Sequence, residues 1–340
     1  MRFLDIQTSE DFAGLEKEWN SFLKHSASHV PFLRHEFMFN WWKTLGGGEW
    51  GEGDLHIVIA REGDGELVGI APLFFTKNRD GDPALMLLGS IEIADYLDLI
   101  ARPENLSAFI KELIDFLLSP QVPPWKVLDW YNLVESSPTR PILRLFCEER
   151  GLAYSEDLLQ HCPYIPLPTD WETYLAGIDK KQRHEIRRKM RRLSEYDLST
   201  RWYIVEDGIK LDDEINDFLD LMAKDPRKAK FLTESMWKQM RAVMHSAFRE
   251  GWLQLCFLEV DGEKAAGYLN FDYKNQIWVY NSGLDPRFYE LSPGWVLLGY
   301  LLQWSIENGR AAFDFMRGEE EYKYRFGAVD RRVVRLLARR

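Results

Sequence analysis

The sequence repeats one order of strands and helices, and this repeat limits the folds that the chain can adopt. Residues 55–75 read LHIVIAREGDGELVGIAPLFF, and residues 253–273 read LQLCFLEVDGEKAAGYLNFDY. Both segments consist of two alternating apolar and polar runs around a turn with glycine, which is the pattern of a β-hairpin. In each half the hairpin precedes a strand, an apolar helix and another strand. The sequence therefore predicts two duplicated domains, each a mixed α/β sheet layered with helices.

The elements after each hairpin set the predicted domain limits. The first half continues with a strand at 84–88, a helix at 106–118 and a strand at 125–130, and the second with a strand at 277–280, a helix from Ser292 and a strand at 311–315. Asp129 and Asp314 then take equivalent places at strand ends. Because prolines crowd residues 154–168, we expect a first domain at 1–155 and a second at 156–340. The second domain adds amphipathic helices at 212–223 and 234–248.

Composition excludes several classes of protein. At 340 residues, with 46% apolar residues, the chain can form two cores. Its net charge of −11 argues against stable nucleic-acid binding, because phosphate contacts need clustered cations. No apolar run approaches the length of about 18 residues that a transmembrane helix needs, and the N-terminus lacks the apolar core of a secretion signal, so we expect a cytoplasmic protein. Cysteine and histidine spacing matches no metal motif, which predicts reduced thiols and no metal.

The helix that begins at Ser292-Pro293-Gly294 is a candidate anion site. Serine is a good N-cap residue, proline suits the first helical turn, and Asn308-Gly309 is typical of a helix end. The first turn of such a helix carries free N–H groups and the positive end of the helix dipole. It can therefore hold a phosphate group.

The C-terminal part resembles the Fem-like and cellulose-biosynthesis-associated acetyltransferases of the GNAT superfamily. The resemblance rests on the Ser-Pro-Gly helix start, on Phe313-Asp314-Phe315, on Arg317-Gly318 and on the run Tyr322-Lys323-Tyr324-Arg325-Phe326-Gly327. It implies two tandem GNAT-like acyl-CoA N-acyltransferase domains, of which the second binds the donor and the first lacks a donor site. The glycine-rich phosphate loop of most GNAT enzymes is absent.

The resemblance assigns donor-facing residues to a strand and to the helix start. Backbone amides of the fourth GNAT strand usually face the thioester carbonyl and pantetheine, and here this strand holds Tyr280, Asn281 and Ser282. Ser292, Gly294 and Trp295 would hold the pyrophosphate of acyl-CoA. The alternative for the first three residues is that they are ordinary strand side chains.

Candidate catalytic residues follow the next strand. The resemblance places Lys323 at the active site, where it would stabilise developing negative charge, with Tyr322 beside it. Asp314 would orient the acceptor or accept a proton. Alternatively, Asp314 caps the following loop and Lys323 extends over a surface. Further substrate-binding candidates are Arg317 and, in the first half, Asp95 and Tyr96.

Residues 180–193, KKQRHEIRRKMRRL, form a strongly basic predicted helix in an acidic protein. Ile186, Met190 and Leu193 form a narrow apolar stripe. Arg183 and Arg187 lie on a neighbouring cationic stripe, and the resemblance makes both acceptor-binding residues. Three interpretations remain open: pairing with acidic neighbours, binding of a phosphorylated acceptor, and binding of RNA or anionic lipid.

These patterns predict an N-acyltransferase that moves an acyl group from acyl-CoA to a small-molecule amine, such as an envelope or polysaccharide precursor. Fem ligases use aminoacyl-tRNA as the donor, which is a second reading within this class. A third reading, from another class, is a catalytically inactive GNAT pair that serves as a binding or scaffold protein. The oligomeric state does not follow from the sequence.

Overall fold

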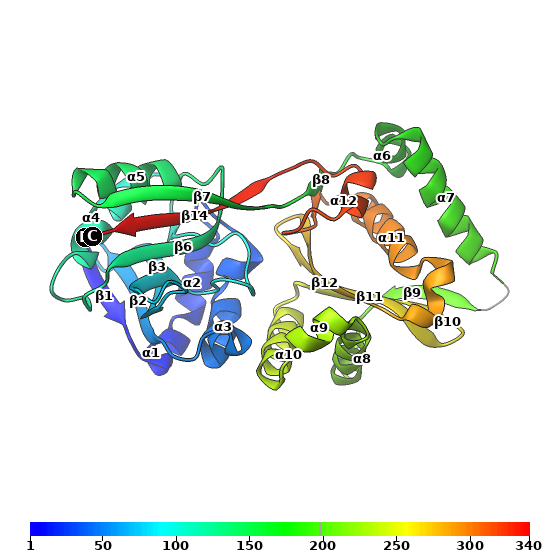
Figure 1. Ribbon diagram of the computed structural model, residues 1–340, viewed down its shortest axis with the longest axis horizontal. Helices are drawn as coiled ribbons and strands as arrows, with labels where there is room; N and C mark the ends of the chain where they lie inside the picture. The colour runs from blue at the N-terminus through cyan, green and yellow to red at the C-terminus, as the bar shows by residue number, and fades with distance from the viewer. Residues whose placement is uncertain (197–198) are drawn as a thin grey trace. The chain divides into compact units, whose positions relative to one another are not determined.

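The computed structural model describes residues 1–196 and 199–340, which fold into two compact units. The first unit is Met1–Gln160 together with Arg332–Arg340, and the second is His161–Arg331. Each unit has its own mixed sheet with helices, which confirms the predicted two-domain α/β fold (Figure 1). The units differ from the predicted domains in two respects: the boundary lies after Gln160 rather than after residue 155, and the last nine residues, assigned to the second domain, lie in the first unit.

The sheet of the first unit has the strand order β1-β2-β3-β4-β6-β14-β7, with β5 paired to β3. The hairpin prediction is confirmed by the antiparallel pair β2 and β3, in which Ile59 faces Ile70. β4 and β6 run parallel, as expected when a helix connects them. The strands are β1 (Arg2–Ile6), β2 (Asp54–Arg61), β3 (Leu67–Lys77), β4 (Pro83–Leu87), β5 (Ile100–Ala101), β6 (Val127–Val134), β7 (Ala153–His161) and β14 (Arg332–Arg339).

Helices cover both faces of this first sheet. Gly69 of β3 lies against Phe109, whereas Phe74 contacts Trp41, and residues an odd number apart on a strand point to opposite faces. The helix with Phe109 therefore covers one face and the helix with Trp41 the other. The helices are α1 (Ser9–Gly14), α2 (Glu16–Leu23), η1 (Pro31–Leu33), α3 (His35–Gly48), α4 (Leu106–Leu117) and α5 (Thr139–Glu149).

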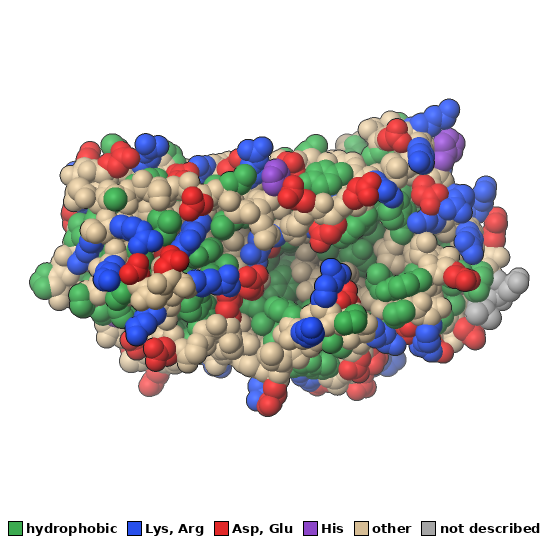
Figure 2. Space-filling view, in the orientation of Figure 1, with side chains coloured by type: hydrophobic (Ala, Val, Ile, Leu, Met, Phe, Trp, Pro, Cys, Tyr) green, Lys and Arg blue, Asp and Glu red, His purple; other side chains and the backbone are tan. Residues whose placement is uncertain are grey.

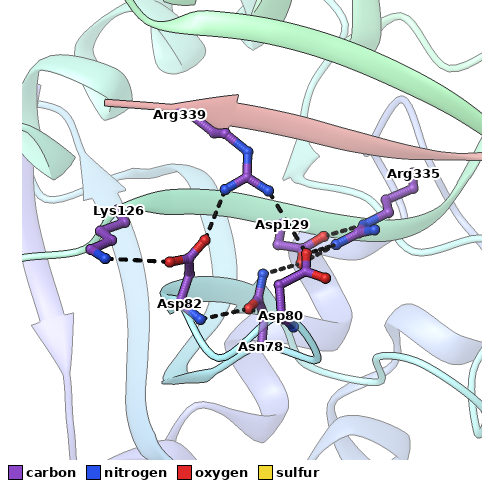
Figure 3. Close-up of polar contacts among 7 residues, drawn as sticks. All are labelled: Asn78, Asp80, Asp82, Lys126, Asp129, Arg335 and Arg339. Atoms are coloured by element: carbon purple, nitrogen blue, oxygen red, sulfur yellow. Dashed lines mark hydrogen bonds and ion pairs between the residues drawn. The ribbon is translucent and has the colours of Figure 1, made fainter.

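A network of charges and hydrogen bonds holds β14 in the first sheet (Figure 3). Arg335 binds both carboxylate oxygens of the fully buried Asp129 at 2.7 Å. Asn78 donates to the same carboxylate, and Arg339 binds Asp82 at 2.9 Å. β14 also pairs along β6, where Leu336 faces Trp130. The predicted boundary missed this strand because it is far in sequence from the strands that it pairs with.

The sheet of the second unit has the order β8-β13-β12-β11-β10-β9. Four of its strands repeat the arrangement of β2, β3, β4 and β6 in the first unit: β10 and β11 form the second predicted hairpin, and β12 and β13 run parallel across a helical connection. This order confirms the predicted repeat. The strands are β8 (Tyr164–Pro166), β9 (Thr200–Ile204), β10 (Leu253–Val260), β11 (Glu263–Tyr273), β12 (Gln276–Leu284) and β13 (Ala312–Asp314).

The second sheet also lies between two helical layers (Figure 1). α11 packs on one face and α8 on the other, and the basic helix α7 packs outside α11. Apolar residues of α7 and α11 form one core with the sheet, including Ile186, Leu297 and Cys256. The helices are α6 (Trp171–Gly177), α7 (Lys180–Ser194), α8 (Leu211–Ala223), α9 (Pro226–Phe231), α10 (Glu234–Arg249), η2 (Pro286–Leu291), α11 (Pro293–Glu307) and α12 (Glu321–Arg325). Within residues 1–196 and 199–340, no helix has both the length and the apolarity needed to cross a bilayer.

Candidate functional site

A pocket of about 270 Å³ opens at the start of α11 in the second unit. It contains five of the predicted site residues, namely Ser282, Ser292, Gly294, Trp295 and Tyr322. The other lining residues are Tyr268, Leu284, Tyr289, Pro293 and Leu298. The walls are therefore mainly aromatic and aliphatic, with the first turn of a helix at one side.

The start of α11 differs from the predicted N-cap. Ser292 has left-handed backbone angles, φ 52° and ψ 50°, and its side chain makes no capping hydrogen bond. The prediction of a serine side-chain cap is therefore wrong, because Ser292 also closes the preceding helix η2, where its N–H bonds to the carbonyl of Tyr289 at 3.0 Å. The side chain of Ser292 consequently does not occupy the first-turn amides at Gly294 and Trp295. A ligand anion can bind amides of this kind.

Strand β12 leaves an open edge next to this pocket. β13 pairs with β12 only from Gln276 to Trp278, so residues 279–284 have no described strand on that side. The N–H of Asp285 donates to the carbonyl of Ala265 in β11. In an antiparallel pair, alternate residues point their N–H and C=O groups to opposite sides, so those of Ser282, three residues before Asp285, point outwards to the open edge. The register with β11 shifts between Leu269 and Asn270, a bulge that leaves Tyr280 without an opposite residue.

The three predicted donor-facing residues of β12 have different surroundings. Ser282 lines the pocket. Asn281 does not, but its side-chain oxygen accepts the N–H of Ser282 at 2.9 Å and the ammonium group of Lys228 at 2.9 Å. Tyr280 packs on Phe271, with ring centroids 5.1 Å apart, and is not among the lining residues.

Lys323 is buried inside its own loop, with 3% of its surface exposed. Its ammonium group donates to the carbonyls of Phe315 at 3.2 Å, Arg317 at 2.9 Å and Gly318 at 3.0 Å. It also pairs with the carboxylate of Glu320 at 2.8 Å. Because an ammonium group has three hydrogens, these contacts use its donors fully. Lys323 therefore organises the loop that carries Tyr322 into the pocket wall.

Tyr322 is the predicted catalytic residue that reaches the pocket. Burial raises the pKa of its hydroxyl above the usual value, and the nearby carboxylate of Glu320 acts in the same direction. The hydroxyl is consequently protonated at neutral pH and can donate a hydrogen bond.

Asp314 lies in a buried ion pair and is not among the pocket residues. Its side chain is fully buried, accepts the N–H of Met316 at 2.8 Å and pairs with Arg331 at 2.9 Å. The guanidinium group of Arg331 also lies 4.2 Å from the ring centroid of Tyr164. Asp129 has the same arrangement with Arg335 and Tyr131 in the first unit. The two aspartates that sequence placed in equivalent positions thus have equivalent partners.

Helix α7 has the predicted apolar stripe and a partly neutralised cationic face. Ile186 and Leu193 are buried, and Met190 packs on Gly299 of α11. Arg183 donates to the carbonyl of Leu175 at 3.3 Å, and Arg187 pairs with Glu172. Figure 2 shows Lys and Arg side chains over α7, with acidic side chains among them. Pairing with acidic neighbours, one of the three predicted interpretations, thus accounts for part of this face.

The remaining predicted site residues are not pocket residues. Arg317 is half-buried, and its carbonyl is one of the acceptors of Lys323. Asp95 and Tyr96 belong to the first unit and are buried there, and Tyr96 has a left-handed φ of 56°. Across residues 1–196 and 199–340, no group of three or more His, Cys, Asp and Glu residues is placed to hold a metal ion.

Sequence reasoning missed Lys228, which contacts β12 at the open edge. This lysine lies in the short helix α9, in the run PRKAKF, where Arg227 and Lys230 are also basic. No motif or period distinguishes it from Lys230 two residues later. Only the hydrogen bonds of Lys228 to Asn281 and Ser282 reveal which of the two faces the strand.

Comparison with known proteins identifies the fold. Residues 180–324 match the family described as an acetyltransferase (GNAT) domain. No curated protein matches the sequence. The crystal structure of FemX covers 99% of this chain, and 97% of FemX is covered in turn, at 12% identity and a TM-score of 0.65.

Two further solved structures are similar over most of their length. L-PGS from Bacillus licheniformis covers 95% of this chain, with 91% of that protein covered, at 14% identity and a TM-score of 0.56. The C-terminal domain of a putative lysylphosphatidylglycerol synthetase from Agrobacterium fabrum covers 98% of this chain, with 92% covered, at 10% identity and a TM-score of 0.55. Residues 180–324 thus match a GNAT domain, and the chain as a whole has the two-domain fold of FemX, in agreement with the resemblance found in the sequence.

Proposed function

We propose that the protein is an acyltransferase that moves an acyl group from acyl-CoA to an amine acceptor. The observation that carries this proposal is the pocket at the start of α11, which lies beside the open edge of β12. The uncapped amides at Gly294 and Trp295 suit a phosphate group, and the side chains of Leu284 and Leu298 suit an extended apolar chain. The residues present therefore fit a donor of the coenzyme A type.

The chemistry requires little covalent participation by the protein. The acceptor amine attacks the thioester carbonyl, and the enzyme contributes proximity, orientation and stabilisation of the charge that develops on the carbonyl oxygen. Tyr322 can donate a hydrogen bond in the pocket, and Lys323 holds the loop that positions it. Asp95, Tyr96, Arg183, Arg187 and Arg317 remain proposed acceptor-binding residues.

Gly294→Ala is expected to weaken acetyl-CoA binding about tenfold, or about 1.4 kcal/mol. A Cβ atom at Gly294 would lie 2.6 Å from Cδ2 of Leu284, a pocket residue, and would push that side chain into the donor space. Gly177→Ala is the control, because a Cβ atom there meets nothing within 4 Å. Titration calorimetry with acetyl-CoA measures both variants and the wild type. Absence of binding to the wild type would favour the inactive, scaffold-type reading instead.

A second candidate donor is aminoacyl-tRNA, and the basic helix favours it. Arg191 and Arg192 are exposed, and within residues 1–196 and 199–340 neither has an ion-pair partner. Among the described residues no carboxylate competes with an anionic ligand for these two cations, unlike the carboxylates that pair with Arg187 and Arg188.

If tRNA binds here, the double variant Arg191→Gln/Arg192→Gln should bind it more weakly. The slope of log binding constant against log salt concentration should also fall by the equivalent of about two released counterions. The unfolding free energy of the variant should change by less than about 0.5 kcal/mol, because neither side chain is buried. Filter binding of bulk tRNA at several salt concentrations gives the slope. Lys238→Gln/Arg249→Gln on α10 removes the same charge elsewhere in the unit and should leave the slope unchanged. Equal slopes for both double variants would exclude α7 as a tRNA site.

A further inference from the structure

Lys228 lies on the strand edge that the proposed donor would use. Asp225 caps α9 by accepting the N–H of Arg227 at 2.8 Å, and this short helix directs Lys228 at β12. The ammonium nitrogen donates to the side-chain oxygen of Asn281 at 2.9 Å and to the backbone carbonyl of Ser282. The hydroxyl of Ser282 is 3.5 Å away, at the outer limit of a hydrogen bond, so the third hydrogen of this ammonium group is held only weakly, unlike those of Lys323. All of these partners are neutral oxygens.

Among residues 1–196 and 199–340, the charge of Lys228 has no counterion in contact. Within the described part of the chain, no carboxylate lies at ion-pair distance from this half-buried lysine. Burial lowers its pKa, while the more distant charges of Asp225 and Glu320 raise it and that of Arg227 lowers it. Glu320 is in direct contact with Lys323 at 2.8 Å instead. A partly buried cation without a contacting anion is costly, and its presence calls for a compensating ligand.

Two neighbouring lysines of the same unit pair with carboxylates, which is the usual arrangement of a lysine with a purely structural role. Lys224, four residues earlier, pairs with the buried Asp285 at 2.6 Å. Lys264 pairs with Asp217 at 2.5 Å and with Glu214. Lys228 differs from both because it is directed at a backbone carbonyl of an open strand edge, and Ser282, which provides that carbonyl, is also a wall of the pocket.

We propose that Lys228 is a catalytic residue that donates to the reacting carbonyl oxygen of the donor. The proposal rests on the function proposed above and adds a residue to it. In the reaction, the amine nitrogen forms a bond to the carbonyl carbon, and the electron pair of the C=O bond moves onto oxygen. That oxyanion then collapses, the carbon–sulfur bond breaks, and the leaving thiolate takes up the proton that the amine loses. The ammonium group of Lys228 compensates the charge on oxygen and itself loses no proton in the cycle.

Lys228→Met keeps the length of the side chain and removes its charge. Thiol release from acetyl-CoA with a panel of primary amines should fall about 100- to 1000-fold in kcat, the usual effect of losing one donor to an oxyanion. The dissociation constant of acetyl-CoA should change less than about threefold, because the charge develops only after binding. Lys228→Arg retains a cation and should recover part of the rate. Lys230→Met on the exposed side of α9 is the matched control and should behave as the wild type.

A second measurement does not depend on turnover. Amine-selective methylation followed by mass spectrometry reports the accessibility of each lysine, and acetyl-CoA should protect Lys228 while leaving Lys230 unchanged. A wild-type rate in Lys228→Met, or donor binding without protection of Lys228, would overturn this inference and leave the acyltransferase proposal standing. A wild-type protein that neither binds acetyl-CoA nor releases thiol would overturn both.

Discussion

Removal of residues 332–340 is expected to unfold the first unit while the second remains folded. β14 is the second-to-last strand of the first sheet and lies between β6 and the edge strand β7, so its loss exposes an edge of β6 and detaches β7. Val333, Leu336 and Ala338 are each at most 2% exposed. Burial of the two larger side chains alone contributes about 3–6 kcal/mol, and the total stability of a domain is only about 5–15 kcal/mol. The truncation also leaves the buried carboxylate of Asp129 without Arg335.

Hydrogen exchange measured by mass spectrometry tests this expectation for each unit separately. Protection should disappear in β2, β3 and β6 and persist in β10, β11 and α11. Removal of Arg340 alone is the control, since this residue makes a hydrogen bond to Lys126 and stacks on Trp125 but lies outside the strand. A truncated chain with a fully protected first sheet would show that β14 is dispensable for that fold.

The sequence predicted local elements well because their signals are local. Hairpin turns, alternation along the strands and the apolar period of α11 are all contained in short windows, and both copies of the repeat appear as predicted. The position of β14, by contrast, depends on a pairing between segments that are far apart in the sequence. β14 pairs with β6, so that Leu336 faces Trp130, although the whole second unit lies between these two residues in the sequence. No local pattern encodes a partner that is so distant in the sequence.

Prediction of the site was limited for a similar reason. Five residues named from the resemblance line the pocket, because strand β12, the helix start and the run around Tyr322 are each short contiguous segments. It could not tell which polar residues of those motifs face the pocket. Lys323 turns inward to three backbone carbonyls, and Ser292 adopts a left-handed conformation between two helices. Lys228 carries no motif at all, and only its contacts with Asn281 and Ser282 single it out.

Asp314→Asn is expected to lower the unfolding free energy by about 3 kcal/mol, the lower end of the range for breaking a buried ion pair. The side chain of Asp314 is fully buried, whereas Arg331 is 24% exposed, so water screens part of the charge that the variant leaves behind. Asparagine keeps the shape and an oxygen that can still accept the N–H of Met316, whose φ of 60° needs such support. It removes the negative charge and replaces one oxygen with a donor that faces a guanidinium group.

Urea unfolding of the second unit measures this loss, and hydrogen exchange of the α11 amides is the readout. Glu321→Gln is the control, because the carboxylate of Glu321 is 79% exposed in its pair with Arg325, and breaking such a surface pair costs at most about 1 kcal/mol. The two aspartates are equivalent, so Asp129→Asn should destabilise the first unit to a similar degree. If Asp314 instead acts mainly on the acceptor, Asp314→Asn will lose transfer activity at wild-type stability. That combination would assign Asp314 a role in the reaction rather than in the stability of the unit. A proton acceptor has to reach the substrate, whereas a buried partner of Arg331 does not.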